Sequence, residues 1–338
     1  MGVLTDGQVV FLKESSWDSP ATPSRALEVL PDGTSHAFDP MVIQGMGLRV
    51  GSQYMRGARR LAGTGRGEIT VKYELESKGF GSLFELLGGS CVSNLVSTGV
   101  YQELCLPTIT SAFQTSATFQ FGVPESDASG TVTPFTYSGC CCKSFEIDAP
   151  DMESPPTVTA TFWAADVTTG TALVAASYPS TPTLFSGAAA ATTLAGSLTM
   201  PTTTALASGG TSVTDIRGWN LSVDLGLAER PALGGWQQPA LGAPKATLKI
   251  KQDYDATTLQ ALLLSQGSVA FTGTYTGGTL TSGSETFQVA VPAAYVDDGA
   301  LAQFTAGDPA VPEITLACLD DLSHTPWAIA IRTADTAL

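Results

Sequence analysis

The sequence predicts a mainly β protein of two tandem domains, each with one α-helix. Alternating apolar and polar residues, the pattern of a strand with one buried face, recur along the whole chain. Each half has one apolar stripe with helical spacing, and three short blocks of the first half recur in order in the second. The 338 residues are enough for two domains of about 150 residues, each with its own core.

The repeated blocks keep their order while their spacing shrinks. Their residues are 79–90 (GFGSLFELLGGS) and 258–269 (TLQALLLSQGSV), 117–124 (ATFQFGVP) and 285–292 (ETFQVAVP), and 155–163 (PPTVTATFW) and 311–319 (VPEITLACL). The offsets are 179, 168 and 156 residues. Such a repeat indicates a duplicated domain and a protein that assembles symmetrically, with chance similarity between β-rich segments as the alternative.

Strand patterns occur at residues 26–30, 68–75, 157–162, 220–224 and 246–251. In the second of these (EITVKYEL) every other residue is apolar, so one face is expected to be buried. The last (ATLKIK) has the same alternation.

One helix is expected in each half. In the first half the apolar stripe stops at Gly88 and Gly89, and in the second it stops at Gly267. Asp255 and Thr257 offer N-cap chemistry for the second helix. We expect both helices to fill a β-structure with their apolar residues, which are Phe80, Leu83, Phe84, Leu87, Leu259, Leu262 and Leu263.

The domain boundary is expected in the turn-rich residues 177–186, which gives domains 1–182 and 183–338. The Ala/Thr/Ser/Gly-rich residues 187–212 fit either a linker or a first strand and loop of the second domain.

A Gly/Arg-rich arm is expected at residues 42–67. This segment has no acidic residue in an otherwise acidic chain, and a strong strand pattern follows it. A contact with a neighbouring ring of subunits and a solvated loop are the two interpretations. Its basic residues are Arg49, Arg56, Arg59, Arg60 and Arg66, whereas the counterpart at 226–244 has only Arg230.

The charge excludes one class of partner. The formal net charge is −15, from 31 acidic and 16 basic residues, and only 14% of residues are charged. A broad surface that neutralises phosphates is therefore not expected, and an acidic wall would repel DNA. The low charge suits strands packed against other subunits.

The six cysteines lack the spacing of a metal site. Cys140, Cys141 and Cys142 are consecutive, so on a strand they point to alternate faces. A strained vicinal disulfide is conceivable, but we expect reduced structural cysteines in a protein made in a reducing cytoplasm.

Catalytic signatures are missing, so no enzyme and no cofactor is expected. His36 and His324 lie near no Ser/Asp or Cys/Asn arrangement, and His36, in a turn-like segment, is expected in an exposed loop. The paired acids at 297–298 and 320–321 lack the calcium-loop spacing and are expected in solvated turns. A glycosidase with two distant carboxylates is the remaining enzymatic alternative. No secretion signal and no membrane span are expected either.

Residues 14–31 and 42–89 resemble the major tail proteins, or tail tube proteins, of long-tailed (siphovirus) phages that infect actinobacteria. The second stretch has the family's Gly/Arg-rich arm, strand, Lys-Gly-Phe-Gly turn and apolar helix. Residues 133–151 (TPFTYSGCCCKSFEIDAPD) and 176–179 (ASYP) resemble further signatures. The triple cysteine departs from the usual single Cys or none.

The resemblance implies tandem tube domains, each a β-sandwich or barrel with a flanking helix. In that family six domains form a ring and the rings stack into a tube. Three chains of two domains would then make a pseudo-hexameric ring, with a net-negative lumen through which genomic DNA passes without specific binding, and the five arm arginines would contact the adjacent ring.

The implied partners are other copies of the chain, the tape-measure protein and the tail terminator and initiator proteins. The implied location is the virion tail, assembled in the host cytoplasm. The alternative function is another β-rich virion or surface binding module, such as a capsid decoration protein.

Overall fold

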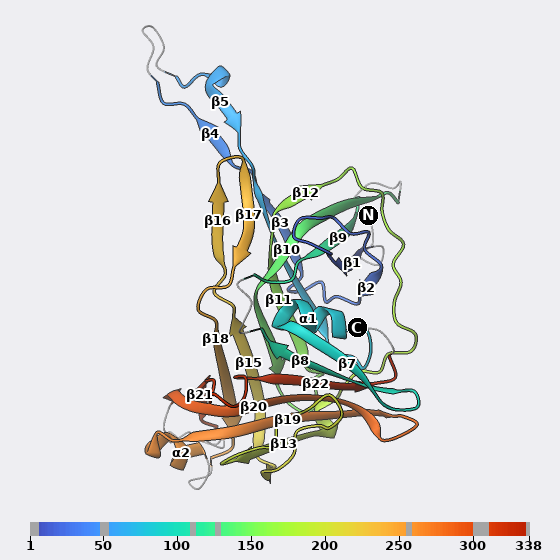
Figure 1. The fold of residues 1–338 in the computed structure, drawn as a ribbon, viewed down its shortest axis with the longest axis vertical. Helices are drawn as coiled ribbons and strands as arrows, with labels where there is room; N and C mark the ends of the chain where they lie inside the picture. Colours follow the sequence, from blue (N-terminus) through green and yellow to red (C-terminus); the bar gives the residue numbers. More distant parts are fainter. Residues whose placement is uncertain are drawn as a thin grey trace.

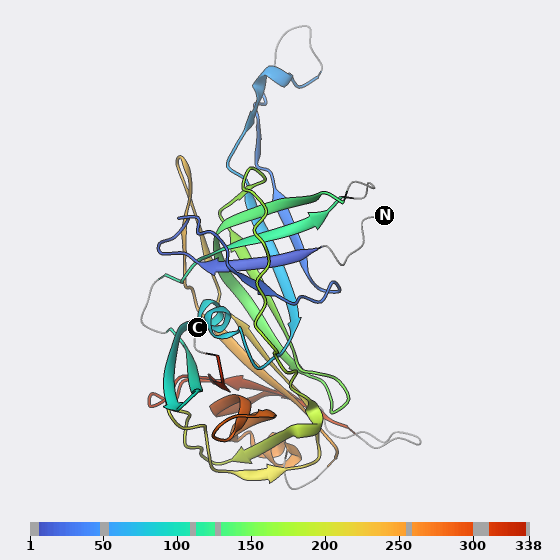
Figure 2. The same cartoon turned by 90° about the vertical axis from the view of Figure 1, so that its right-hand side faces the viewer.

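The protein is mainly antiparallel β-structure, as predicted. The computed structural model describes residues 7–47, 54–108, 113–125, 130–254, 259–299 and 311–335. The molecule is elongated, with a hairpin projecting from one end (Figures 1 and 2). In these ranges no helix is long and apolar enough to cross a membrane.

Two sheets form the first half, and one long strand belongs to both. The first sheet has the order β2 (Arg25–Leu27), β1 (Gln8–Lys13), β9 (Ala117–Pro124), β10 (Val132–Ala149), β12 (Asp166–Thr168). The second has the order β3 (Ser35–Asp39), β6 (Arg66–Glu74), β11 (Thr157–Ala164), β10. β10 pairs with β9 as far as Cys140 and with β11 from Cys141 onward, with a bulge between Cys142 and Ser144.

The second half has the same order of pairings. Its first sheet is β14 (Thr211–Val213), β13 (Ala190–Ala195), β19 (Ser268–Thr279), β20 (Ser284–Gly299), β22 (Ala328–Thr333). Its second is β15 (Ile216–Asp224), β18 (Lys245–Gln252), β21 (Glu313–Cys318), β20. β10 and β20 are therefore the two strands that pass from one sheet to the other.

The repeated sequence blocks agree with this pattern at two places out of three. The first block falls on the helices α1 (Gly81–Gly88) and α2 (Leu259–Ser265), and the third falls on β11 and β21. The middle block falls on β9 and β20, although the pairings match β9 with β19. This part of the sequence comparison was wrong because strands of similar composition resemble one another whatever their place in the sheet.

Within the described residues, a hairpin of β7 (Gly89–Ser97) and β8 (Val100–Pro107) follows the helix of the first half and has no counterpart after α2. It lies between α1 and β9, whereas α2 ends at Ser265 and β19 begins at Ser268. β8 pairs with β22, the last strand of the second half. The hairpin therefore joins the two halves.

Cys91 and Cys105 lie opposite each other in this hairpin and form a disulfide. The expectation of reduced cysteines was wrong for this pair, because cross-strand register, which spacing in sequence does not reveal, brings the two thiols together. Cys140, Cys141, Cys142 and Cys318 are free and buried.

A second connection joins the second sheet of the first half to the second sheet of the second half. The end of β10 pairs with β15 from Ser144 opposite Asp224 to Ala149 opposite Trp219. The result is one antiparallel sheet of eight strands, in the order β3-β6-β11-β10-β15-β18-β21-β20. We call it the eight-stranded sheet.

The helix α1 packs into the core. Its C-cap is Gly89, whose φ of 96° is unfavourable for residues with a Cβ. Its predicted apolar residues Phe80, Leu83, Phe84 and Leu87 are buried, and Phe84 reaches Phe287 of the second half.

The helix α2 is less deeply buried than α1. Leu262 and Leu263 are half-buried and pack on the same core as α1. Leu259 opens α2, but its side chain lies outside the described part.

Two hairpins occupy matching places before β6 and β18. The first, β4 (Val42–Gln44) with β5 (Arg60–Ala62), is the predicted arm, and a 3-10 turn at Gly57–Arg59 precedes β5. The second, β16 (Ala228–Ala232) with β17 (Gly235–Ala240), lies beside the base of the arm (Figure 1). Trp236 of this second hairpin donates to the Thr64 carbonyl and packs edge-on against Trp163.

A buried carboxyl lies in the hairpin that joins the halves. Glu103 on β8 is 2% exposed, opposite Ile331 of β22 and against Gly81 of α1. Burial is the main cause that raises the pKa of Glu103 to about 8; nearby Asp335 also acts to raise it, and Arg25 acts to lower it. The folded protein therefore holds this proton at a pH where the unfolded chain releases it.

This carboxyl makes stability depend on pH. Because the folded pKa is above the unfolded value, its favourable contribution is complete below about pH 4.5 and is lost as the pH rises toward 8. We expect Glu103→Gln to flatten the fall in melting temperature between pH 5 and 8.5 by several degrees. Calorimetry checks this, with the exposed Glu125→Gln as control. Parallel pH profiles of Glu103→Gln and the parent protein would contradict it.

Candidate functional site

The eight-stranded sheet has one apolar and one polar face. On β6, Ile69, Val71 and Tyr73 are fully buried while the residues between them are at least partly exposed. On β18, Leu248 and Ile250 are buried between exposed lysines. Because side chains alternate along a strand, the polar residues of neighbouring strands share the other face. We call it the polar face.

Charges on the polar face are mixed. Among the described residues it has nine carboxylates, which belong to Asp39, Glu68, Glu74, Glu146, Asp148, Asp224, Asp297, Asp298 and Glu313. Its six basic residues are Arg66, Lys72, Lys143, Lys245, Lys249 and Lys251. Threonines of β11 and β21 lie between the charged strands.

Most lysines of the polar face lie beside a carboxylate of another strand, one or two strands away. Lys249 and Lys251 are 3.9 and 3.5 Å from the Glu313 carboxylate. Lys143 is 3.3 Å from Glu68, and Lys245 is 4.0 Å from Asp297. These pairs are about half exposed, so each contributes only about 0–1 kcal/mol to stability. Their main effect is local neutralisation of the lysines.

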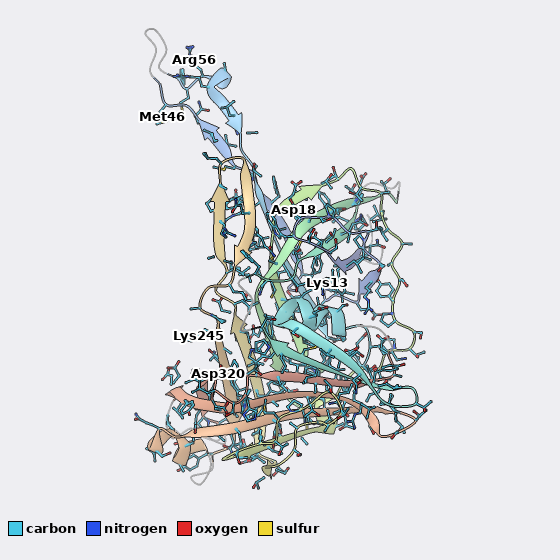
Figure 3. All side chains as sticks on the ribbon, in the orientation of Figure 1. Lys13, Asp18, Met46, Arg56, Lys245 and Asp320 are labelled. Carbon is cyan, nitrogen blue, oxygen red and sulfur yellow. A yellow bond between two sulfur atoms is a disulfide. The ribbon has the colours of Figure 1, made fainter. Side chains whose placement is uncertain are left out.

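The arm presents apolar side chains to solvent. Tyr54 is 88% exposed and Met46 is 74% exposed, and Met46 lies on the arm far from the body (Figure 3). Met41, Val42, Ile43, Met55 and Leu61 are also exposed. A cluster of this kind is typical of an interaction surface. The Gly/Arg pattern of the segment did not predict this apolar surface, although the apolar residues are visible in its sequence.

The structure separates the five predicted arm arginines. Arg59 folds back over Gly45 and Gly47, and Arg60 is exposed on β5. Arg66 lies at the base, on β6, and forms an ion pair with Glu229 of β16. Arg56 is half-buried on the arm (Figure 3), and Arg49 lies outside the described residues.

The histidines are placed differently from each other. His36 was expected in an exposed loop, which was wrong. It is half-buried on β3, its Nδ1 lies 2.9 Å from the Tyr137 hydroxyl, and it packs on Phe121 and Phe135. Burial lowers the pKa of His36. The aromatic residues that cover His36 come from strands distant in sequence, so the local sequence around His36 does not reveal its burial.

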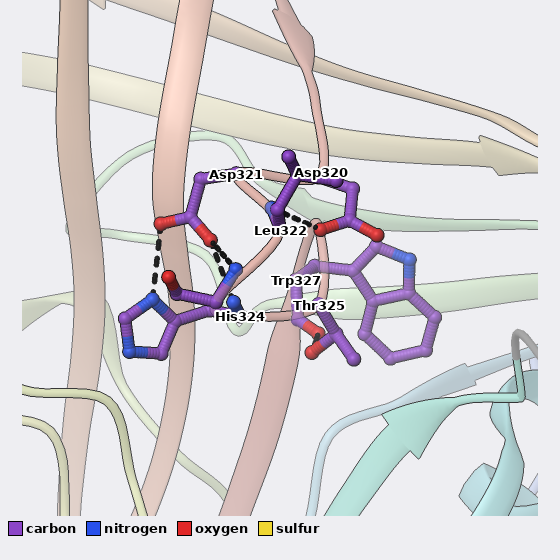
Figure 4. Close-up of polar contacts among 7 residues, drawn as sticks. Asp320, Asp321, Leu322, His324, Thr325 and Trp327 are labelled. Atoms are coloured by element: carbon purple, nitrogen blue, oxygen red, sulfur yellow. Dashed lines mark hydrogen bonds and ion pairs between the residues drawn. The ribbon is translucent and has the colours of Figure 1, made fainter.

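His324 lies in an exposed turn, together with the paired acids at 320–321 that were expected in a solvated turn. The Asp321 carboxylate accepts hydrogen bonds from the Ser323 and His324 amides and lies 3.0 Å from His324 Nδ1 (Figure 4). These contacts lower the pKa of Asp321. Within the described ranges no three His, Cys, Asp or Glu side chains are arranged to hold a metal ion.

The comparisons with known proteins give one family. The sequence profile described as "Phage tail tube protein" matches residues 5–317. No curated protein matches the chain.

Proposed function

Because this chain belongs to the phage tail tube protein family, a family of structural proteins and not of enzymes, we propose that three copies close into a ring and that rings stack into the tail tube. The observation that carries the proposal is the eight-stranded sheet with one apolar and one polar face. Three such sheets would supply 3 × 8, or 24, strands around a lumen. Ring closure would pair the sheet edges, which otherwise promote aggregation.

The repeated order of pairings supports two tube domains per chain, with residues 1–182 and 183–338 as their bounds. Each half supplies one four-stranded part of the eight-stranded sheet, and each has a helix and a hairpin in the same place. Six such units per ring would give the pseudo-hexameric trimer.

The polar face would line the lumen and let DNA pass without binding. Three chains have a net charge of 3 × −15, or −45. On the polar face carboxylates outnumber basic groups, and the neighbouring carboxylates neutralise most of its lysines. Phosphates would then meet repulsion and few free cations.

The arm would contact the adjacent ring, with apolar burial as the main attraction. Burial of apolar surface contributes about 25 cal/mol per Å², whereas an exposed ion pair contributes about 0–1 kcal/mol. The arginines Arg49, Arg56, Arg59 and Arg60 would add register by pairing with carboxylates of that ring, while Arg66 would hold the base.

In this proposal the protein is part of the virion tail of a siphovirus of actinobacteria and is assembled in the host cytoplasm. Its further partners would be the tape-measure protein inside the tube and the terminator and initiator proteins at its ends. The passing genome would make no specific contacts.

Electron microscopy with native mass spectrometry tests the assembly. We expect hollow tubes and rings of three chains from the purified protein, or from the protein with its initiator present. Rings of six chains would overturn the trimer. A discrete particle that never elongates would favour a decoration protein instead.

Changes in the arm test the contact between rings. We expect Ile43→Ser/Leu61→Ser, which removes two exposed apolar residues paired across the arm, to reduce tube length at least tenfold while rings still form. Arg59→Glu/Arg60→Glu should also stop elongation. Tube lengths are measured by electron microscopy, with exposed Val92→Ser on β7 as control. Tubes of normal length from both arm variants would refute this role.

Removal of a neutralising carboxylate tests the lumen. Glu313→Gln leaves Lys249 and Lys251 without their carboxylate, so tubes should retain DNA severalfold longer at low salt, and the difference should vanish at high salt. The measurement is the rate of DNA release from assembled particles, with Glu125→Gln as a control of equal charge change. Equal rates for the two variants would contradict the proposal.

A further inference from the structure

A cavity lined mainly by apolar residues lies between the two halves of the chain. Its volume is about 150 Å³, and an apolar cavity of that size holds one small aromatic molecule. The ends of α1 and β8 in the first half and of β15, β18 and β21 in the second contribute to its walls. Its buried apolar lining consists of Val223, Leu225, Ala246, Cys318 and Trp327. The exposed residues Phe113 and Lys245 mark its mouth.

Two polar residues of the cavity wall have a side-chain oxygen without a partner. Among the described residues, Gln114 Oε1 and Thr108 Oγ1 are buried and have no hydrogen-bond partner. Gln114 is only 7% exposed, and both residues line the cavity. A buried polar atom without a partner is unfavourable and rare in folded proteins. The cavity therefore combines an apolar wall with one amide oxygen and one hydroxyl that are available to a ligand.

The largest side chain of the wall is held in place by its neighbours. A Cβ at Gly88 would lie 2.8 Å from Trp327 Cη2, so the indole ring packs directly on the end of α1. Trp327 also packs edge-on against Phe145, with ring centroids 5.4 Å apart. The Thr108 amide donates to the Gly88 carbonyl at 2.8 Å, which joins the end of β8 to the same helix. The cavity is therefore preformed, as small-molecule sites usually are.

We propose that this cavity binds a small uncharged molecule with one apolar ring and one hydroxyl group, of which phenol is the simplest. The ring buries its surface against the apolar lining, while the hydroxyl donates to Gln114 Oε1 and accepts from Thr108 Oγ1. An ionised ligand would lose its hydration without a buried charged partner, because Lys245 of the lining is exposed. This site is independent of the ring proposed above.

The mouth of the cavity is attached to the β16–β17 hairpin. Phe113 forms an isolated β-bridge with Ala240, and Gln238 Nε2 donates to the Gln114 carbonyl at 2.7 Å. The Arg230 guanidinium lies over the Phe113 ring, 5.4 Å from its centre. A ligand bound to Gln114 therefore restrains this hairpin, which lies beside the base of the arm (Figure 1).

Titration of the purified full-length chain with phenol and with benzene tests the site, and the NMR signal of the Trp327 indole N–H reports binding. We expect saturable binding of both probes, with phenol at least fivefold tighter because benzene has no hydroxyl. The double variant Gln114→Met/Thr108→Val should reduce phenol to the affinity of benzene and leave benzene unchanged. Ala246→Leu, which fills the cavity, should abolish binding of both. The exposed Ala37→Leu on β3 is the matched control and should change neither.

Equal affinities for phenol and benzene, or a phenol affinity that the double variant leaves unchanged, would overturn the proposal. Absence of saturable binding would overturn it as well. If Ala246→Leu does not fold, the double variant and the two probes decide. Amide exchange gives a second readout: at saturating phenol, exchange in the β16–β17 hairpin should slow at least threefold. Unchanged exchange there would refute the restraint of the hairpin. None of these results bears on ring formation, which electron microscopy tests separately.

Discussion

The pairing of backbone groups at strand edges is the constraint on which this structure depends. A sheet edge presents unpaired N–H and C=O groups that must find partners, meet water or be covered. Inside the chain, the backbone groups of β10 pair with those of β15 across the two halves, and the backbone groups of β8 pair with those of β22. These two pairings join the two halves of the chain into one system of sheets.

The long strands β10 and β20 make this arrangement possible. Each pairs with one sheet first and, after a bulge, with the other, so the two sheets of a half cover a shared core. The helix α1 fills the space near the boundary, where Phe84 contacts Phe287 and Phe145 contacts Trp327. Close packing at this place favours one orientation of the halves.

Many of the charged residues of this weakly charged chain lie on the polar face of the eight-stranded sheet. Some of the acidic residues, Glu68, Asp297 and Glu313, lie beside lysines of other strands of the same sheet, so these opposite charges neutralise one another within the sheet. Apolar side chains are instead left exposed on the arm. The molecule thus separates a charged face of the sheet from an apolar surface suited to protein contact.

The sequence by itself determined the local features of this protein. Alternation at residues 68–75 and the stripe at Phe80, Leu83, Phe84 and Leu87 fixed a strand and a helix, because both patterns are local; the Gly/Arg-rich segment marked the arm. Only the tertiary structure decided which strands pair, that Cys91 meets Cys105, that His36 lies among aromatic rings and that Lys249 faces Glu313. Those contacts join residues far apart in the chain, and local sequence patterns do not specify which distant segments pack together.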